Sequence, residues 1–288
     1  MYTKVQNIIK LNSIYTKCAL CNSDRYHPLS HDGNSFYRCM DCRVIFNSRY
    51  IQLRYDSNYF LEKYKKQYSK TYLEDFDNIY NIALKRLKKI ITKLEDKANI
   101  KKISLLDIGS AMGFFLKAAR DTGIDSIKGV EISNFAAEYC TNEFNIDVIN
   151  SSFMETNLEK SYDIITAWFF IEHCEHPSQV IKKIYHILNH NGIFAFSVPS
   201  IFGPLFLFNR SNWINNHPVD HKIDFSPFSV KKYLKKIGFR KIKTSPGGIH
   251  PERVLSQNSL FYKPFKVLYP LLSRAISFSD TIEVIAIK

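Results

Sequence analysis

The chain has 288 residues, of which 45% are apolar, 14% aromatic and 23% charged. That apolar share excludes a largely disordered chain, and only 10 Gly and 10 Pro exclude a collagen-like or linker-like sequence. The length predicts one large domain or two smaller ones. Lys and Arg number 40 against 27 Asp and Glu, and the resulting net charge of +13 makes nucleic acid or an anionic surface a candidate partner.

No apolar run reaches the roughly 18 to 20 residues that a membrane-spanning helix needs. Residues 1–17 lack the apolar core and the cleavage site of a signal peptide. We therefore expect a cytoplasmic protein without a transmembrane segment.

Four of the six cysteines form two C-x-x-C pairs, namely Cys18 with Cys21 and Cys39 with Cys42. Seventeen residues separate the two pairs. This spacing is typical of a tetrahedral zinc site with four thiolate ligands, and such a closed site is structural rather than catalytic. A redox dithiol is the alternative. Cys140 and Cys174 have no such partner and are expected to be buried apolar residues. We predict a zinc ribbon over residues 1–50.

A long amphipathic helix is predicted over 71–96, because apolar residues recur there every three or four positions. Its other face carries basic residues, which we interpret as a solvated surface rather than a nucleic-acid stripe: Lys85, Arg86, Lys88, Lys89 and Lys93. Residues 51–100 are expected to form a helical connector and cap.

Strand and helix patterns then alternate. The predicted strands cover 103–108, 127–132, 147–150, 163–170, 192–198, 239–244 and 281–287. The predicted helices cover 113–121, 133–143 with Ser133 as the N-cap, 177–188 and 226–237. Such alternation indicates parallel strands joined by right-handed crossovers. We predict an α/β Rossmann-like domain over 101–288, with inserted loops at 200–225 and 245–280.

The most informative stretch is SLLDIGSAMGFFL, residues 104–116. A buried strand ends at Asp107, and a turn with Gly109 and Gly113 leads into a helix. Glycine lets a backbone turn tightly and approach a ligand closely. The next strand ends at Glu131, whose carboxylate can accept hydrogen bonds from both ribose hydroxyls of a nucleoside. These residues predict a nucleoside-containing ligand at the carboxyl edge of the strands.

This stretch resembles the first motif, D-x-G-x-x-x-G, of class I S-adenosylmethionine-dependent methyltransferases. The resemblance covers roughly residues 100–288 and includes YDIITAWFFIEHCEHP at 162–177, ILNHNGIFAFSVP at 187–199 and HPVDHKIDFS at 217–226. It implies a seven-stranded sheet that is mostly parallel, with the last strand antiparallel. It also implies that S-adenosylmethionine is the cofactor.

The cofactor-binding residues that the resemblance implies are Asp107, Gly109, Ser110 and Gly113 around the methionine part, Glu131 at the ribose, Ile132 on one face of the adenine, and Ser152 and Phe153 after the third strand. Serine at position 152 departs from the acid that the family often has there. Ala111 replaces a common glycine, and we expect a negative φ at that position to tolerate the change.

The cysteine segment resembles the N-terminal zinc ribbon of some methyltransferases through YRCMDCRVIF at 37–46 and YDSNYF at 55–60. Many proteins with this arrangement modify small molecules, including sugars of surface polysaccharides. A ribbon also occurs in some ribosomal RNA methyltransferases, so it does not by itself select the substrate.

Candidates for a general base follow the fourth and fifth strands of the implied fold: Glu172, His173, His176, His217 and His221. Histidine suits this role because its pKa lies near working pH. Our first choice is His173, with His221 second and Glu172 as a further candidate. The [DNS]-P-P-[YF] signature of many N-methyltransferases is absent, because AWFF stands at 167–170. Its absence favours methylation of oxygen or carbon.

The leading hypothesis is therefore methyl transfer to an oxygen or carbon of a small molecule, such as a sugar or a polysaccharide precursor. An RNA methyltransferase that uses the ribbon to bind its substrate is the alternative. A non-catalytic zinc-ribbon scaffold with a silent Rossmann-like domain is the second alternative. The apolar loops 201–208 and 245–275 would wall a substrate pocket, cover a homodimer surface or add to the core.

Overall fold

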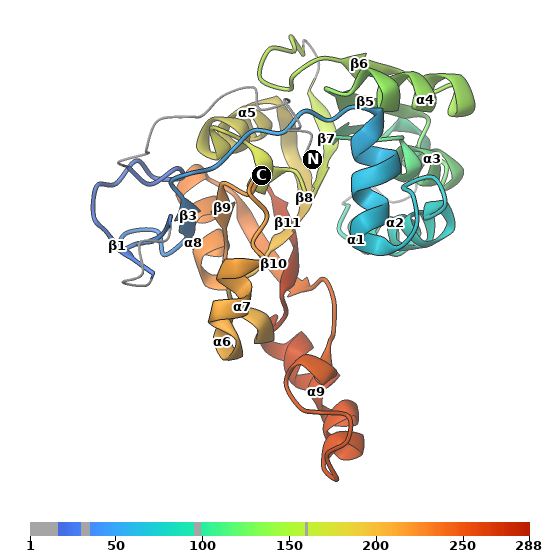
Figure 1. The fold of residues 1–288 in the computed structure, drawn as a ribbon. Helices are drawn as coiled ribbons and strands as arrows, with labels where there is room; N and C mark the ends of the chain where they lie inside the picture. The colour runs from blue at the N-terminus through green and yellow to red at the C-terminus, as the bar shows by residue number, and fades with distance from the viewer. Residues whose placement is uncertain (1–16, 30–34, 95–98, 159–160) are drawn as a thin grey trace, which may run out of the picture.

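The computed structural model describes residues 17–29, 35–94, 99–158 and 161–288. It contains a small sheet in the order β1-β2-β3-β9 and a large sheet in the order β10-β11-β8-β7-β4-β5-β6 (Figure 1). The strands of the small sheet are β1 (Tyr26–Pro28), β2 (Phe36–Cys39), β3 (Ile45–Asn47) and β9 (Ile223–Asp224). The strands of the large sheet are β4 (Ser104–Ile108), β5 (Ser126–Glu131), β6 (Val148–Asn150), β7 (Tyr162–Trp168), β8 (Leu188–Pro199), β10 (Arg240–Pro246) and β11 (Thr281–Ile287).

Strands β4 to β8 of the large sheet pair in parallel, and β11 runs antiparallel to both β8 and β10. The mostly parallel seven-stranded sheet with an antiparallel last strand is thus confirmed. The strands predicted over 103–170 match β4 to β7 closely, whereas β8 begins at Leu188 rather than at residue 192.

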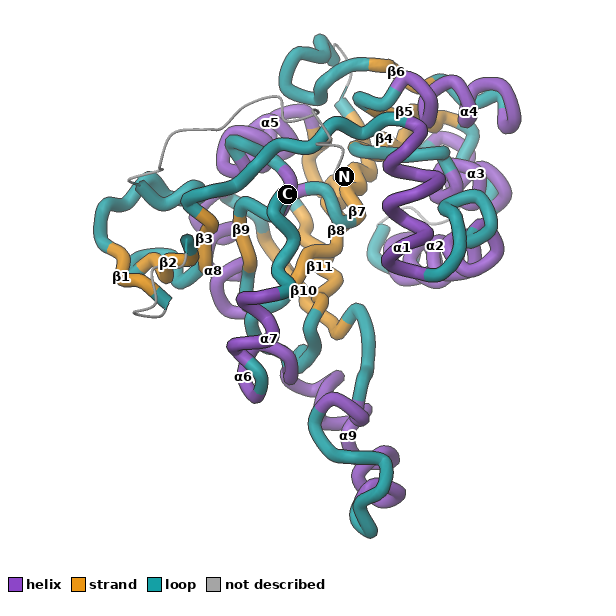
Figure 2. The backbone as a smooth tube through the Cα atoms, in the orientation of Figure 1, coloured by secondary structure: helices purple, strands orange, loops and turns teal. Residues whose placement is uncertain are grey.

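Helices cover both faces of the large sheet (Figures 1 and 2). On one face lie α2 (Phe76–Ile91), α3 (Phe114–Asp121) and α4 (Asn134–Phe144), and on the other lie α5 (Pro177–Ile187) and α8 (Pro227–Ile237). Ser133 caps α4 by accepting the amide of Ala136, as predicted. The remaining helical segments are η1 (Tyr59–Lys63), α1 (Tyr64–Tyr68), η2 (Ile100–Lys102), η3 (Ile171–His173), α6 (Pro204–Phe208), α7 (Arg210–Asn215), η4 (Pro251–Arg253) and α9 (Tyr262–Ile276).

Helix α2 is shorter than the predicted 71–96, whose residues 95–98 lie outside the described part of the chain. The expectation that Arg86 belongs to a solvated basic face is wrong. Its guanidinium lies 4.1 Å from the centre of the Trp168 ring, and its Nε donates to Glu283 over 2.9 Å. Arg86 therefore links α2 to β7 and β11. Exposed Lys89 reaches the same carboxylate from the outside, over 2.7 Å.

The small sheet is joined to the body of the molecule by β9. This short strand pairs with β3, Phe46 opposite Ile223, although it lies far downstream within the predicted insert at 200–225. The buried side chains of the two sheets form one continuous core, which contains Val44 and Phe46 as well as Ile108 and Phe225. The cysteine-bearing segment is consequently packed on the large sheet.

The two segments expected to be apolar loops contain helices. Residues 201–208 include α6, and 245–275 include most of α9. Proline usually ends or kinks a helix, but α9 continues through Pro270. Helix α9 lies in a lobe that projects away from the large sheet (Figure 1). Within the described residues, the structure has no helix long and apolar enough to cross a membrane.

Candidate active site at the carboxyl edge of the large sheet

Asp107 lies near the end of β4, where the central parallel strands open toward a shared edge. Its Oδ1 accepts a hydrogen bond of 2.6 Å from the hydroxyl of Thr166 on the neighbouring strand β7. Burial raises the pKa of Asp107 to about 7, and the Thr166 hydrogen bond opposes that rise. A carboxylate fixed this firmly at a strand end is suited to orient a ligand or the turn that follows it.

The turn after β4 has left-handed backbone at three positions: Gly109 (φ 67°), Ala111 (φ 48°) and Gly113 (φ 78°). The negative φ expected at Ala111 is therefore wrong. The amide of Ala111 donates to Glu131 Oε2 over 2.8 Å, which helps to hold this residue in a conformation that costs an L-residue about 1 kcal/mol. At Gly113 a Cβ would lie 2.0 Å from Cys140 Sγ, so only glycine fits against α4.

Glu131 at the end of β5 holds the turn in place. Its two carboxylate oxygens accept the amides of Ala111 and Ser133, each over 2.8 Å. Burial raises the pKa of this carboxyl group. Each oxygen keeps a second lone pair, so the group can still accept hydrogen bonds from a ligand.

Two neighbouring features fit a nucleoside-containing ligand. The hydroxyl of Ser110 is buried and has no hydrogen-bond partner among the described residues. Ile132, which follows Glu131, exposes 54% of its surface. An unsatisfied hydroxyl and an exposed apolar side chain at one edge suit a ligand with a polar part and a flat apolar part.

The other two predicted cofactor residues follow β6. Ser152 is half-buried and its carbonyl accepts the hydroxyl of Thr156 over 2.8 Å. Phe153 is buried in the main core, with the Lys183 ammonium 4.7 Å from its ring centre. Lys183 also donates to the carbonyl of Phe153 over 2.6 Å, so it fastens this loop to α5.

A histidine cluster lies beyond the end of β7. The ring centre of His173, in η3, is 4.7 Å from that of His221. Its Nδ1 lies 3.1 Å from the backbone carbonyl oxygen of Asp220 and also 3.1 Å from Asp220 Oδ2. The hydroxyl of Tyr55 donates to the same Asp220 oxygen over 3.2 Å. These contacts leave His173 Nε2 as the ring atom that is not engaged by Asp220.

The pKa values of the two histidines in this cluster shift in opposite directions. Burial lowers the pKa of His173, but its hydrogen bond with Asp220 and the charge of Glu172 raise it overall. Burial and the nearby His173 lower the pKa of His221 to about 3, so this imidazole is neutral at pH 7. Asp220 has a pKa of about 2, because His173 outweighs the effect of burial.

Three of the predicted catalytic residues are brought together, since ligand atoms of Glu172, His173 and His221 lie within 4.8 Å of one another. Glu172 is fully buried, neither of its carboxylate oxygens has a hydrogen-bond partner in the described part of the chain, and burial raises its pKa to about 7. His176 is exposed at the start of α5 and makes no part of this cluster.

Sequence reasoning missed Asp220, which orients His173. A signal was available, because Asp220 directly precedes His221 in the segment HPVDHKIDFS. His217 is held by a second pair, with its Nε2 2.9 Å from Asp224 Oδ2 on β9.

The four paired cysteines converge beside the small sheet, where Cys39 ends β2 and the other three lie in turns. Their Sγ atoms lie within 4.8 Å of one another, with 3.5 Å from Cys18 to Cys42 and from Cys21 to Cys39. Tetrahedral zinc with thiolate bonds of about 2.3 Å separates its sulfur ligands by roughly 3.8 Å, so this donor set fits zinc. Of the two cysteines expected to be buried, Cys140 is fully buried and Cys174 is half-buried.

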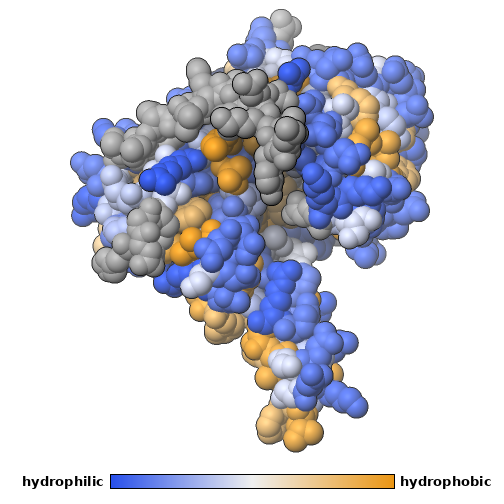
Figure 3. All heavy atoms as spheres, viewed as in Figure 1, coloured by the Kyte–Doolittle hydropathy of each residue, from blue (hydrophilic) through white to orange (hydrophobic). Residues whose placement is uncertain are grey.

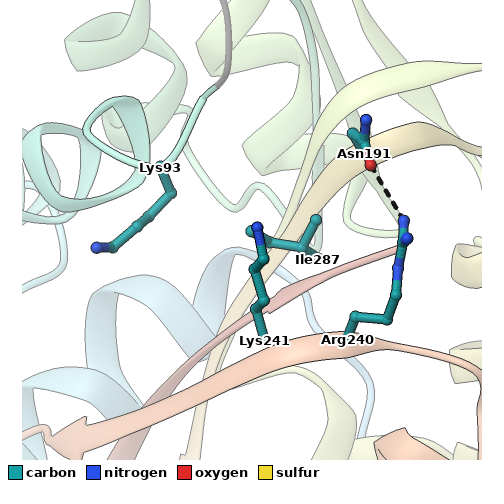
Figure 4. Close-up of a pocket in the computed structure, with 5 residues that line it drawn as sticks. All are labelled: Lys93, Asn191, Arg240, Lys241 and Ile287. Carbon is teal, nitrogen blue, oxygen red and sulfur yellow. Dashed lines mark hydrogen bonds between the residues drawn. The ribbon is translucent and has the colours of Figure 1, made fainter.

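A pocket away from this edge of the sheet is lined mainly by cationic side chains. This pocket, of about 190 Å³, lies at the opposite, amino-terminal edge of the parallel strands. Its lining residues are Lys93, Asn191, Arg240, Lys241 and Ile287. Figure 4 shows Arg240 directed at Asn191, to which it donates over 3.0 Å. With three cations and no acid or nucleophile, this pocket lacks the groups for the chemistry described above.

The sheet order and the turn between Asp107 and Gly113 define the class I fold of S-adenosylmethionine-dependent methyltransferases. Residues 80–244, more than half of the chain, match the family described as a methyltransferase domain, and the chain belongs to this family. It is an S-adenosylmethionine-dependent methyltransferase.

Relatives and solved structures agree with this assignment. The chain is 24% identical over 173 residues to the ubiquinone biosynthesis O-methyltransferase of Rickettsia typhi, covering 56% of this chain and 70% of that protein. The corresponding protein of Rickettsia prowazekii is 27% identical, covering 56% and 68%.

The fold is similar to that of a SAM-dependent methyltransferase from Archaeoglobus fulgidus, with a TM-score of 0.53, 19% identity and coverage of 78% of this chain and 98% of the other. A possible histamine N-methyltransferase from Thermotoga maritima gives a TM-score of 0.54 at 16% identity, covering 80% and 96%.

Proposed function

We propose that this chain transfers a methyl group to a hydroxyl oxygen of a small molecule, with His173 as the general base. The observation that carries the proposal is the pairing of His173 Nδ1 with the Asp220 carboxylate at the end of β7. Such a pair fixes the tautomer and orientation of the imidazole and presents Nε2 to a substrate.

S-adenosylmethionine supplies a methyl carbon activated by its sulfonium group. His173 Nε2 accepts the proton of the acceptor hydroxyl as the oxygen forms its bond to that carbon. When bound, the cofactor would supply the leaving group, because its sulfonium sulfur would take up the electron pair of the carbon–sulfur bond and leave as a neutral thioether. Neutral His221, whose ring centre is 4.7 Å from that of His173, is suited to hold the acceptor hydroxyl by a hydrogen bond. Buried Glu172 supports the positive charge that His173 gains.

The residues proposed to hold the cofactor are those implied by the motif: Asp107, Gly109, Ser110, Gly113, Glu131, Ile132, Ser152 and Phe153. The unsatisfied Ser110 hydroxyl and the exposed Ile132 support this assignment. The proposed structural zinc is held by Cys18, Cys21, Cys39 and Cys42, within a ribbon over residues 1–50 that precedes a connector over 51–100 and the methyltransferase domain over 101–288.

The acceptor is proposed to be a small molecule with an ionisable hydroxyl. The two rickettsial relatives carry the name ubiquinone biosynthesis O-methyltransferase, which supports an oxygen acceptor. Neither of those names supports the sugar or polysaccharide precursor expected from the sequence. A phenolic hydroxyl also matches a histidine base better than a sugar hydroxyl does, because a phenol has a pKa of about 10.

The test is isothermal titration with S-adenosylmethionine, followed by methyl-transfer assays on phenols, nucleotide sugars and RNA. We expect cofactor binding and transfer to a phenol. His173→Gln should lower kcat by about 10²- to 10⁴-fold without changing cofactor affinity. His176→Gln is the matched control, since His176 is exposed and outside the cluster.

Absence of cofactor binding would instead support the silent scaffold. Transfer to RNA alone, with binding that weakens steeply as salt rises, would support the RNA methyltransferase. Full activity of His173→Gln would exclude this residue as the base.

A further inference from the structure

The projecting lobe that contains α9 exposes an unusual amount of apolar surface. Seven large apolar side chains in and just before this helix are 57–93% exposed: Leu260, Phe261, Val267, Leu268, Leu271, Leu272 and Ile276. We call this set the α9 apolar face. Hydrophobic colour gathers over the lobe in Figure 3, away from the body of the molecule. A contiguous exposed apolar patch marks a site of interaction with a partner or a membrane.

The α9 apolar face follows the helical repeat. Its members in the helix are spaced by one, three or four residues, which places them on one side, whereas Tyr269 and Ser273 on another side are buried. Pro270 lies inside the helix without ending it. Helix α9 therefore packs against its own lobe through the side that holds Tyr269 and Ser273, and its apolar face points outward.

The charges of this segment have a single sign. The helix carries Lys263, Lys266 and Arg274, and the sequence has no Asp or Glu between residues 254 and 279. The flanking Asp280 is paired with Arg253 over 2.5 Å. Viewed along the helix, Lys263 and Arg274 lie beside one border of the α9 apolar face, since their spacing of eleven residues is close to three turns.

Helix α6 adds exposed apolar side chains at the same end of the molecule. Leu207 and Phe208 are 42% and 64% exposed, and the Phe208 ring centre lies 6.3 Å from that of Phe278, which follows α9. Figure 1 places α6 and α9 on the side of the large sheet away from α3 and α4.

We propose that α9 is a membrane-surface anchor, whose apolar face enters the headgroup region of an anionic lipid bilayer while its basic residues contact the lipid headgroups. A helix with an apolar face and only basic charges is suited to lie in such an interface. A second copy of this chain is a poorer occupant, because a symmetric contact would bring two sets of Lys and Arg together with no acid to pair them. The net charge of +13 adds to the attraction for an anionic surface.

The test is sedimentation of the full zinc-loaded chain with phosphatidylcholine vesicles that contain or lack phosphatidylglycerol. We expect binding to the anionic vesicles that weakens as salt rises. The double variant Leu268→Glu/Leu271→Glu should lose about a hundredfold or more in partitioning. The double variant Lys263→Gln/Arg274→Gln should lose about fivefold in binding to the anionic vesicles for each charge removed, and its preference for them over phosphatidylcholine vesicles should shrink accordingly.

Phe228→Glu on α8 is the matched control, because Phe228 is also exposed, at 65%, and lies outside this lobe. It should bind as the wild type does. Each variant should keep the wild-type circular dichroism and affinity for S-adenosylmethionine, and the charge variant gives an answer even where the glutamate variant fails to fold. Three results would overturn the proposal: no wild-type binding to anionic vesicles, equal losses in the control, or a stable dimer that Leu268→Glu/Leu271→Glu dissociates.

Discussion

His173 Nδ1 lies 3.1 Å from Asp220 Oδ2, and this contact joins the end of β7 to the loop that leads into β9. The hydroxyl of Tyr50, three residues after β3, donates to the carbonyl of His173 over 2.6 Å. Lys222 donates its amide to the carbonyl of Glu172 over 2.6 Å. The proposed base is thus held by backbone and side chains from both the large sheet and the segments attached to the small one.

The first prediction concerns the pH dependence of methyl transfer. Asp220 helps to raise the pKa of His173, and a general base must be unprotonated, so activity should rise with pH through a pKa above the ordinary 6.5. Asp220→Asn removes the negative charge and should move this acidic limb to lower pH, while kcat falls about tenfold or more because the imidazole is less well oriented. The measurement is kcat/KM against pH.

Asp224→Asn is the control for that experiment, because Asp224 pairs with His217 rather than with His173. Its acidic limb should stay where the wild type has it. An unchanged limb in Asp220→Asn would mean that another group titrates.

The second prediction concerns removal of the proposed zinc. Because β3 pairs with β9, loss of the metal should disturb the loop that carries Asp220 and His221. Cys42→Ser, or treatment with a chelator, should lower methyl transfer by roughly tenfold or more while leaving S-adenosylmethionine affinity nearly unchanged. The measurements are zinc content, the rate of methyl transfer and the affinity for S-adenosylmethionine, each made on the same preparation. An equal loss of cofactor binding would show that the metal supports the whole fold.

The sequence predicted the large sheet well because its signals are local. Buried strands such as Ser104–Ile108 and capped helices such as the one after Ser133 depend on residues close in the chain. The C-x-x-C pairs likewise predicted which four cysteines lie together. By contrast, the pairing of β3 with β9 depends on Ile223 and Asp224, which most of the chain separates from the cysteine segment. No local pattern records such a contact.

The candidate site was predicted in part for the same reason. The motif placed Asp107, Gly113 and Glu131 correctly at one edge, but the positive φ of Ala111 depends on the hydrogen bond that Glu131 accepts from its amide. The orienting role of Asp220 depends on the distance from β7 to the loop before β9. Such relations follow from packing, which a single sequence does not display.

The third prediction tests the close approach of α3 and α4. Gly113→Ala adds a Cβ that would lie 2.0 Å from Cys140 Sγ, at a φ of 78°. We expect a loss of about 2–4 kcal/mol in the free energy of unfolding and a clear loss of cofactor affinity, because backbone strain and overpacking add. Gly113→Ala/Cys140→Ala should recover the overpacking part, as urea titration measures. No recovery in the double variant would assign the whole effect to backbone strain.

The fourth prediction concerns stability and Asp107. This carboxyl group has a pKa of about 7 in the folded chain and an ordinary value near 4 when unfolded, so the unfolded chain releases its proton first. The free energy of unfolding should therefore decline between about pH 4 and pH 7, by an amount on the order of a few kcal/mol. Asp107→Asn cannot ionise and should flatten that decline while weakening cofactor binding. Urea titrations at pH 5 and pH 8 measure the difference, and parallel pH dependences in both proteins would contradict it.

The fifth prediction compares two cations that share one carboxylate. Arg86 and Lys89 both contact Glu283, but the Arg86 side chain is 13% exposed and stacks on Trp168, whereas that of Lys89 is 52% exposed. Arg86→Ala leaves Glu283, itself 11% exposed, with only a solvent-facing partner and removes the contact between α2 and β7. It should lower the free energy of unfolding by about 3 kcal/mol, because the largely buried Glu283 carboxylate would keep its desolvation penalty and lose its main partner. Lys89→Ala should cost less than about 1 kcal/mol, because water screens an exposed pair. Equal losses in urea titration would contradict the inward role of Arg86.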